Sequence, residues 1–168
     1  TQAGGKLPAS LQEKMADYCL LHNIKFYVMY GQSEATARMG YLPYNLAKEK
    51  LNYIGIAIPN GKFSLEDDEG NLITTSNTKG ELIYEGDNVS LGYALNLDDL
   101  AKGDDNKGKL KTGDIAIFDE DHLFKIIGRK SRFLKIYGNR VGLDEIQTLL
   151  QEHFKSSEIA CVGTDDHL

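Results

Sequence analysis

The sequence has no tryptophan, only three prolines and only two cysteines. Cys19 and Cys161 lie far apart and neither belongs to a CxxC pair, which disfavours a disulfide framework or a zinc site and favours two free thiols. The four histidines are scattered, and no two of them have the spacing of metal ligands. We therefore expect a protein of the reducing cytoplasm without a metal centre built from cysteine and histidine.

Long apolar runs and an excess of positive charge are also missing. No stretch approaches the roughly 20 apolar residues of a membrane-spanning helix, and the first residues do not resemble a signal peptide. Nineteen Lys and Arg against 25 Asp and Glu give a net charge of −6 and a pI near 5.2. An acidic surface repels polyanions, so we expect neither a nucleic-acid partner nor an anionic membrane surface.

The remaining composition is typical of a folded domain. A length of 168 residues, with 41% hydrophobic side chains, favours one domain, or one domain with a small second unit, that buries a core without disulfides. Charged residues make up 26% of the chain, which excludes a disordered or coiled-coil protein. The first residues, TQAGGKLP, include no initiator Met, so we expect a piece of a longer protein.

A helix followed by a strand is predicted near the start. Pro8 suits the first turn of a helix that extends to about Leu21. Its apolar stripe, at helical spacing, would consist of Leu7, Leu11, Met15, Tyr18 and Cys19. Residues 24–30 then alternate as a strand, which Gly31 ends. The inner faces of both elements need a cover, so we expect either a missing half of the protein or self-association of the chain.

From residue 54 onward the pattern changes to short strands joined by turns. Residues 54–59, 62–74 and 79–86 predict a meander, and residues 98–111 predict a solvated loop. Residues 115–129 predict a hairpin around an acidic turn. We therefore expect a mixed α/β (α+β) fold, in which a helix–strand unit joins a mainly antiparallel, partly barrel-like sheet.

A second unit is predicted after that hairpin. A short strand at residues 133–137 precedes a helix that Asp144 can cap, and another strand is expected at residues 158–163. Such a strand–helix–strand beginning buries neither face well by itself. We divide the chain into residues 1–128, part of a large domain, and residues 129–168, the truncated beginning of a small α+β C-terminal domain.

Four segments carry side chains suited to chemistry, although each alone is also typical of an ordinary turn or a solvated face. The first, YGQSE, presents the aromatic Tyr30, the hydroxyl of Ser33 and Glu34, whose oxygens suit Mg²⁺. The second, GELIYEGDNVSLGY, demands no chemistry. In the third, KTGD, Asp114 follows Gly113 and can accept hydrogen bonds from ribose hydroxyls. The fourth, GRKSRFLKIYGNRVGLDEI, is a basic patch that suits a phosphate.

In this order and spacing, the four segments resemble the later half of the adenylate-forming enzymes. This superfamily includes acyl- and aryl-CoA ligases, luciferases and peptide-synthetase adenylation domains. The resemblance extends from Gly4 to about Gly163. It implies the C-terminal portion of an AMP-forming, acyl-CoA ligase-like enzyme that binds ATP or AMP with Mg²⁺. Its substrate would be a small-molecule carboxylic acid, and its acceptor thiol would be coenzyme A or carrier-protein phosphopantetheine.

The resemblance also implies roles for individual residues. Glu34 would bind Mg²⁺, Ser131 would lie at the hinge, where many members carry Asp or Lys, and Gly138 would border the thiol tunnel. The acyl pocket would include Ala35, Thr36 and Ala37. The nucleotide would contact Gly4, Gly5, Tyr30, Gly31, Gln32, Ser33, Asp114 and Arg129. Among these, the tyrosine would stack on adenine, and the aspartate and arginine would reach the ribose.

Two family elements are absent from the sequence, namely the phosphate loop that ends in lysine and the late loop with the catalytic lysine. We expect both in missing N- and C-terminal parts of the same protein. With no complete catalytic set, the 168-residue chain alone would form no adenylate. The alternatives are an amino-acid or aryl-acid adenylation domain of the peptide-synthetase type, a non-catalytic nucleotide-binding module and a small β-barrel interaction protein.

Overall fold

The computed structural model describes residues 1–137, 139–155 and 158–165. Its main body is an open, twisted sheet of eight strands in the order β1-β2-β3-β8-β7-β6-β4-β5, and every neighbouring pair is antiparallel. The strands are β1 (Val28–Tyr30), β2 (Gly40–Leu42), β3 (Tyr53–Ala57), β4 (Lys62–Glu66), β5 (Leu72–Ile73), β6 (Gly80–Glu85), β7 (Lys109–Phe118) and β8 (Phe124–Arg129). The mixed α/β fold is therefore confirmed, and β1 and β5 remain as the two edges, so the sheet does not close into a barrel.

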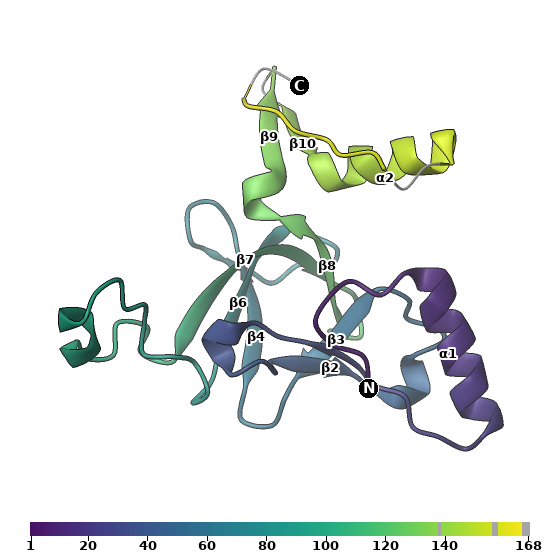
Figure 1. The fold of residues 1–168 in the computed structure, drawn as a ribbon, viewed down its shortest axis with the longest axis horizontal. Helices are drawn as coiled ribbons and strands as arrows, with labels where there is room; N and C mark the ends of the chain where they lie inside the picture. The colour runs from purple at the N-terminus through teal and green to yellow at the C-terminus, as the bar shows by residue number, and fades with distance from the viewer. Residues whose placement is uncertain (138, 156–157, 166–168) are drawn as a thin grey trace.

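A smaller unit follows the end of β8 and lies beyond the main sheet in Figure 1. It begins with the 3₁₀ turn η4 (Lys130–Arg132) and continues as the antiparallel pair β9 (Phe133–Ile136) and β10 (Asn139–Gly142). Helix α2 (Leu143–Phe154) completes it. The prediction of a strand at residues 158–163 is wrong, because these residues form no strand in the structure.

The predicted first strand is shorter than expected. Residues 24–27 lie outside β1, whose ladder with β2 runs only from Val28 opposite Leu42 to Tyr30 opposite Gly40. On its other side, β1 makes a single parallel bridge between Val28 and Gln2. Because β1 is an edge strand, its length is set by the one neighbour beside it rather than by its own alternation of apolar side chains.

Helix α1 (Ala9–Leu21) confirms the predicted helix, and of the predicted apolar stripe Cys19 is buried and Leu7 half-buried, while the other three side chains stay exposed. The face turned to the protein consists of Gln12, Ala16 and Cys19. On another face, Leu11 and Tyr18 keep 46% and 55% of their surface exposed. Within the buried face, the Gln12 amide bonds to backbone groups of Ala47, Lys50 and Asn52.

The core of the main body lies on the β3–β8–β7–β6–β4 part of the sheet. Aromatic rings dominate it: Phe63 makes edge or tilted contacts with Tyr84 at 5.6 Å and with Phe124 at 5.3 Å between ring centroids. Tyr30 joins this cluster from β1, with its ring centroid 6.1 Å from that of Phe63. The core therefore fixes one side of the Tyr30 ring.

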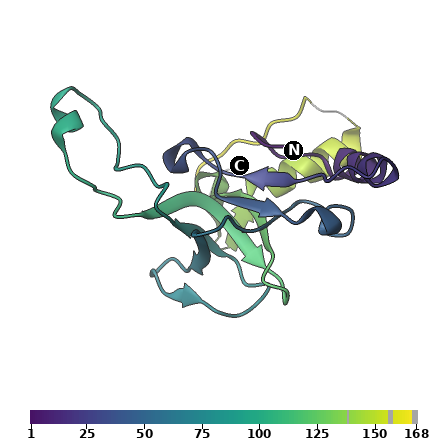
Figure 2. The same cartoon turned by 90° about the horizontal axis from the view of Figure 1, so that it is seen from below.

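Two short loops of the main body are organised as 3₁₀ turns, η1 (Ser33–Ala35) and η2 (Tyr44–Leu46). A third, η3 (Asp98–Ala101), lies within the long connection from β6 to β7. That connection projects away from the sheet in Figure 2. Among the described residues, no helix combines the length and the apolar character that crossing a membrane requires.

Candidate functional site

A pocket of about 810 Å³ opens where several separate parts of the chain meet. Its walls come from the N-terminal segment, from β1 and the turn after it, from the start of β3, from Tyr93, from β7 with the end of β8, and from the start of α2. The sequence-predicted residues that line it are Gly4, Gly5, Tyr30, Gly31, Gln32, Ser33, Glu34, Ala37, Asp114 and Arg129. Three of the four segments singled out in the sequence thus contribute predicted residues to one cavity.

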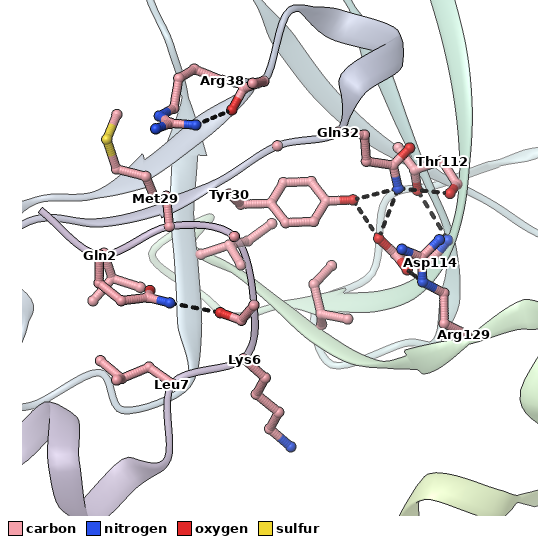
Figure 3. Close-up of a pocket in the computed structure, with 18 of the residues that line it drawn as sticks. Gln2, Lys6, Leu7, Met29, Tyr30, Gln32, Arg38, Thr112, Asp114 and Arg129 are labelled. Atoms are coloured by element: carbon pink, nitrogen blue, oxygen red, sulfur yellow. Dashed lines mark hydrogen bonds and ion pairs between the residues drawn. The ribbon is translucent and has the colours of Figure 1, made fainter.

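Asp114 is the centre of this site. Its carboxylate is almost completely buried, with 5% of the side chain exposed. Oδ2 accepts a hydrogen bond of 2.5 Å from the Tyr30 hydroxyl, and Oδ1 lies 2.8 Å from Nε of Arg129 (Figure 3). Asp114 and Arg129 face each other directly across the β7–β8 ladder, and cross-strand partners project from the same face of a sheet. The hairpin register therefore builds this ion pair.

Gln32 also bonds to the carboxylate, and Thr112 holds the backbone next to it. Gln32 Nε2 donates to Asp114 Oδ2 at 3.1 Å and to the carbonyl oxygen of Thr112 at 2.9 Å (Figure 3). The hydroxyl of Thr112 accepts a hydrogen bond from the Asp114 backbone N–H at 3.1 Å and donates to the Leu82 carbonyl at 2.7 Å. Sequence reasoning missed Thr112, and its only signal was its place two residues before the aspartate in KTGD.

Gly113 gives β7 its local bend at this point. Its φ of 69° lies in the left-handed region that glycine adopts without strain. The register of β7 against β6 and that of β7 against β8 both shift within one or two residues of this glycine. Such irregularities re-aim a side chain relative to the regular pleat. In the sequence Thr-Gly-Asp, this irregularity lets the Asp114 side chain reach Tyr30 of β1.

The Tyr30 hydroxyl is held in its neutral form. Burial of the phenol raises the pKa of Tyr30 well above its usual range, and the negative charge of Asp114 and the hydrogen bond to it raise it further. A neutral phenol can donate its proton to the carboxylate, whereas a phenolate would repel it. Tyr30 therefore acts as a fixed hydrogen-bond donor in the site.

Glu34 lies on the turn that follows β1. A Cβ at Gly31 would meet the carbonyl oxygen of Ala37 at 2.4 Å, so glycine allows the turn to fold back on itself. The Glu34 carboxylate accepts a hydrogen bond of 2.5 Å from the hydroxyl of Tyr93, and this bond is the main cause that lowers the pKa of Glu34. Tyr93 also lines the pocket, and sequence reasoning missed it.

Other predicted residues lie elsewhere. Ala35 is fully buried in the core, and the hydroxyl of Thr36 bonds to the backbone of Asn88, so neither lines the pocket that Ala37 lines. Ser131 is exposed within η4. Gly138, the predicted border of the thiol tunnel, lies outside the described residues.

The donor set of the pocket suits Mg²⁺ only in combination with a nucleotide. Among the described residues, no group of three or more His, Cys, Asp or Glu side chains forms a metal cage. Mg²⁺ in nucleotide sites is commonly held by one or two carboxylates together with phosphates and water. Three carboxylates line the pocket: Asp114 pairs with Arg129 and Asp144 with Arg132, so Glu34 is the one that fits this pattern.

The chain is similar to several known proteins. A family model described as AMP-binding enzyme matches residues 1–94. A long-chain-fatty-acid–CoA ligase from Yersinia pestis is 34% identical over 142 residues, which cover 83% of this chain and 24% of that protein. A 4-hydroxybutyrate–CoA ligase from Metallosphaera sedula is 34% identical over 146 residues, which cover 86% and 26%. The chain thus spans about a quarter of the length of the curated relatives it matches.

Solved structures share the fold. An amide bond synthetase from Marinactinospora thermotolerans superposes with a TM-score of 0.75 at 21% identity, covering 98% of this chain and 33% of that one. An O-succinylbenzoate coenzyme A synthetase from Bacillus subtilis, solved in complex with ATP and a magnesium ion, gives a TM-score of 0.69 at 23% identity, covering 89% and 30%. At these identities the likeness concerns the fold.

Proposed function

Because the chain belongs to the AMP-binding enzyme family, we propose that it supplies the adenosine-binding part of an AMP-forming acid–thiol ligase. The observation that carries the proposal is the meeting of Tyr30, Asp114 and Arg129 in one pocket, from β1, β7 and β8. Each of these residues alone is compatible with an ordinary turn or ion pair. Their convergence beside the pocket-lining Glu34 is what a nucleotide with its cation requires.

The ribose would bind at Asp114 and Arg129. A carboxylate offers about four lone-pair positions, and three side-chain donors, from Tyr30, Gln32 and Arg129, already point at this one. The remaining position can accept a hydrogen bond from one ribose hydroxyl. Arg129 uses Nε on the aspartate and keeps 56% of its side chain exposed, so its other N–H groups can donate to the second hydroxyl.

The base and the α-phosphate would lie on either side of that ribose. The Tyr30 ring offers a flat face for adenine. Gly4 and Gly5 line the same pocket, and no atom lies within 4 Å of a Cβ built on either, so they leave room beside the base. Ser33 lies on the turn next to Glu34 and would present its hydroxyl to the α-phosphate.

Mg²⁺ would be held by Glu34 together with the phosphates of the nucleotide. When bound, the ion offsets the negative charge of the phosphates, which is a large electrostatic contribution to phosphoryl chemistry. Glu34 is suited to the task because its carboxylate lines the pocket and the hydroxyl of Tyr93 holds it by a hydrogen bond.

The reaction would proceed in two steps. A substrate carboxylate oxygen attacks the α-phosphorus of ATP, an O–P bond forms, the bond to the β-phosphate oxygen breaks, and pyrophosphate leaves. A thiol sulfur then attacks the acyl carbon, its proton is released, and AMP departs with the carboxyl oxygen that joined it. The first step turns a poor electrophile into an activated acyl group, and this chain would contribute orientation of the adenosine.

We propose the domain boundary between residues 128 and 129, at the end of β8 and just before η4. On one side of Ser131, Lys130 forms an ion pair of 2.6 Å with Glu81 of β6, which ties it to the main sheet. On the other side, Arg132 pairs with Asp144 of α2 and belongs to the small unit. Ser131, exposed between two anchored residues, is the hinge we propose between residues 1–128 and 129–168.

The substrate class is a carboxylic acid that is a small molecule rather than a polymer, and the acceptor is coenzyme A or the phosphopantetheine of a carrier protein. The relatives act, by their names, on long-chain fatty acids and on 4-hydroxybutyrate, so the class rather than one acid is supported. Missing N- and C-terminal parts of the protein would supply the pyrophosphate site and the catalytic lysine. Cys19 and Cys161 are both free thiols, which supports a cytoplasmic location.

Titration of the 168-residue chain with AMP, followed by calorimetry with and without Mg²⁺, tests the proposal. We expect binding that Asp114→Ala weakens by about 1–3 kcal/mol, the loss typical of hydrogen bonds to a charged group. Glu120→Gln, on the exposed β7–β8 turn, is the matched control and should bind as the wild type does. An unchanged affinity for Asp114→Ala would remove this residue from the site.

Turnover assays compare the activity of the 168-residue chain with that of the intact protein. The 168-residue chain alone should release no pyrophosphate from ATP with any acid. The intact protein, screened over fatty, aryl and amino acids, should release it with at least one of them. Pyrophosphate release by the chain alone would contradict the expectation that catalysis needs the missing parts.

A further inference from the structure

The turn that carries Glu34 has an unfavourable backbone. We call residues 33–38 the Glu34 turn. Thr36 and Ala37 have φ values of 48° and 65°, so two successive residues with a Cβ lie in the left-handed region. Such a conformation persists only where surrounding contacts hold it. Its position therefore depends on what bonds to its backbone.

Asn88 supplies those contacts from the segment after β6. Its Nδ2 donates to the carbonyl oxygen of Ala35 at 2.7 Å and to that of Arg38 at 3.0 Å, so one amide bonds to both ends of the strained part of the turn. Two residues later, the backbone N–H of Ser90 donates to the carbonyl oxygen of Glu34 itself at 2.7 Å. The chain thus fixes the Glu34 turn across 53 residues of sequence.

Asn88 is itself anchored to the core. Its Oδ1 accepts a hydrogen bond of 2.7 Å from the hydroxyl of Tyr84, a fully buried residue of β6. A Cβ at Gly86 would lie 2.7 Å from that hydroxyl oxygen and 2.8 Å from Asn88 Oδ1, so glycine at this position lets the two groups meet. The amide orientation is therefore fixed, with its N–H groups toward the turn and its oxygen toward the core.

The end of the segment GELIYEGDNVSLGY thus holds Glu34 in place from two sides. Asn88 holds the backbone on both sides of the strained pair, and Tyr93 donates to the Glu34 carboxylate. Asn88 is not among the residues that line the pocket, so its effect on a ligand would pass through the turn.

We propose that Asn88 is a positioning residue, whose side-chain amide holds the Glu34 turn so that the Glu34 carboxylate faces a divalent cation on the bound nucleotide. This inference rests on the proposed function, because it needs a nucleotide in the pocket. A positioning role differs from a purely structural role in one respect: loss of the Asn88 amide lowers the affinity for the cation more than the affinity for adenosine.

Asn88→Asp is the sharpest test, because it keeps the shape and replaces the two donors by an oxygen that faces two carbonyl oxygens. Binding of Mn²⁺, used in place of Mg²⁺, is measured by electron paramagnetic resonance in the presence of AMP. We expect at least a five-fold loss of Mn²⁺ affinity, with adenosine affinity in the absence of metal changed less than two-fold. Asn71→Ala, in the β4–β5 turn, is the control and should change neither affinity.

Two further measurements keep the test decisive. In Glu34→Gln, the added Asn88→Asp should cause no further loss of Mn²⁺ affinity, because the amide acts through the carboxylate. In the absence of ligand, exchange of the Ala37 amide, which bonds to Gln32 O at 3.0 Å, should accelerate at least ten-fold in Asn88→Asp while amides of β4 and β6 do not change. If Asn88→Asp does not fold, Asn88→Ser replaces it in the test. The serine side chain is too short to reach both carbonyl oxygens, so we expect the same results.

The outcomes separate the two proposals. If the wild-type chain binds neither adenosine nor AMP with Mn²⁺, the proposed function fails, and the role of Asn88 toward a cation fails with it. If the wild type binds both and the variant binds Mn²⁺ equally well, or loses adenosine to the same extent as Mn²⁺, only the positioning role is refuted. An unchanged exchange rate at Ala37 also refutes it.

Discussion

The hydroxyl oxygen of Tyr30 lies 2.5 Å from Oδ2 of Asp114, although 84 residues separate them in the sequence. The phenol is mostly buried and the carboxylate is almost completely so. A buried carboxylate needs donors for its lone pairs, because an unsatisfied charge in the interior is costly. Tyr30 therefore has two tasks: its hydroxyl stabilises Asp114, and its ring forms part of the pocket wall.

Tyr30→Phe separates these tasks, since the ring stays and the donor is removed. We expect the free energy of unfolding, measured by urea denaturation, to fall by about 1–3 kcal/mol, the range for a hydrogen bond to a charged group. The matched control is Tyr18→Phe on the exposed side of α1, where the change should stay within about 0.5 kcal/mol. Equal effects of the two substitutions would contradict the role given to the Tyr30 hydroxyl.

The pKa of Tyr30 predicts a pH dependence of definite sign. Its pKa is raised in the folded state, chiefly by burial and then by Asp114. The folded protein therefore holds this proton more tightly than the unfolded chain, and the resulting stability is present in full below about pH 10, the usual tyrosine pKa. It is lost as the pH rises above that value toward the folded pKa.

An ultraviolet titration checks this directly. Wild type and Tyr30→Phe should give the same tyrosinate absorbance near pH 10, since the Tyr30 hydroxyl does not ionise there while the protein is folded. After unfolding in urea, the wild type should show one more ionising tyrosine than the variant. A difference between the folded proteins near pH 10 would mean that Tyr30 titrates as an exposed phenol.

Local patterns in the sequence predicted the elements whose formation depends on near neighbours. The helix expected from Pro8 to Leu21 is α1, and the hairpin expected at residues 115–129 is formed by β7 and β8. What the patterns missed depends on distant partners. The expected strand at residues 24–30 shrank to Val28–Tyr30, because the β2 ladder alone sets its length.

The site shows the same division. The resemblance to the family predicted Tyr30, Asp114 and Arg129, and the structure brings them together. Thr112 and Asn88 were not predicted, because each acts through carbonyl groups on other strands and turns. A threonine two residues before an aspartate, or an asparagine two residues after a glycine, is not a distinctive local pattern. Only the tertiary structure shows which backbone groups they satisfy.

Gln12 is a polar residue in the buried face of a helix. It is fully buried in α1, and its amide donates to the Ala47 carbonyl at 2.8 Å and accepts from the Asn52 N–H at 3.1 Å. Gln12→Leu leaves these backbone groups unsatisfied, so we expect the free energy of unfolding to fall by about 1–3 kcal/mol. Lys14→Leu on the exposed side of α1 is the control and should have little effect in the same denaturation experiment.

The exposed apolar side chains of α1 predict how the chain behaves in solution. Leu11, Met15 and Tyr18 lie at helical spacing and keep 46%, 39% and 55% of their surface exposed. An exposed apolar patch favours contact with another surface, and for the isolated chain that surface is a second copy. We expect light scattering to give a mass that rises with concentration, and we expect a hydrophobic dye to bind.

Leu11→Gln combined with Met15→Gln should reduce both effects without loss of helix, since glutamine favours helices nearly as well as leucine and methionine do. Lys14→Gln should leave both effects unchanged, and a monomer at all concentrations that binds no dye would show that this face needs no cover.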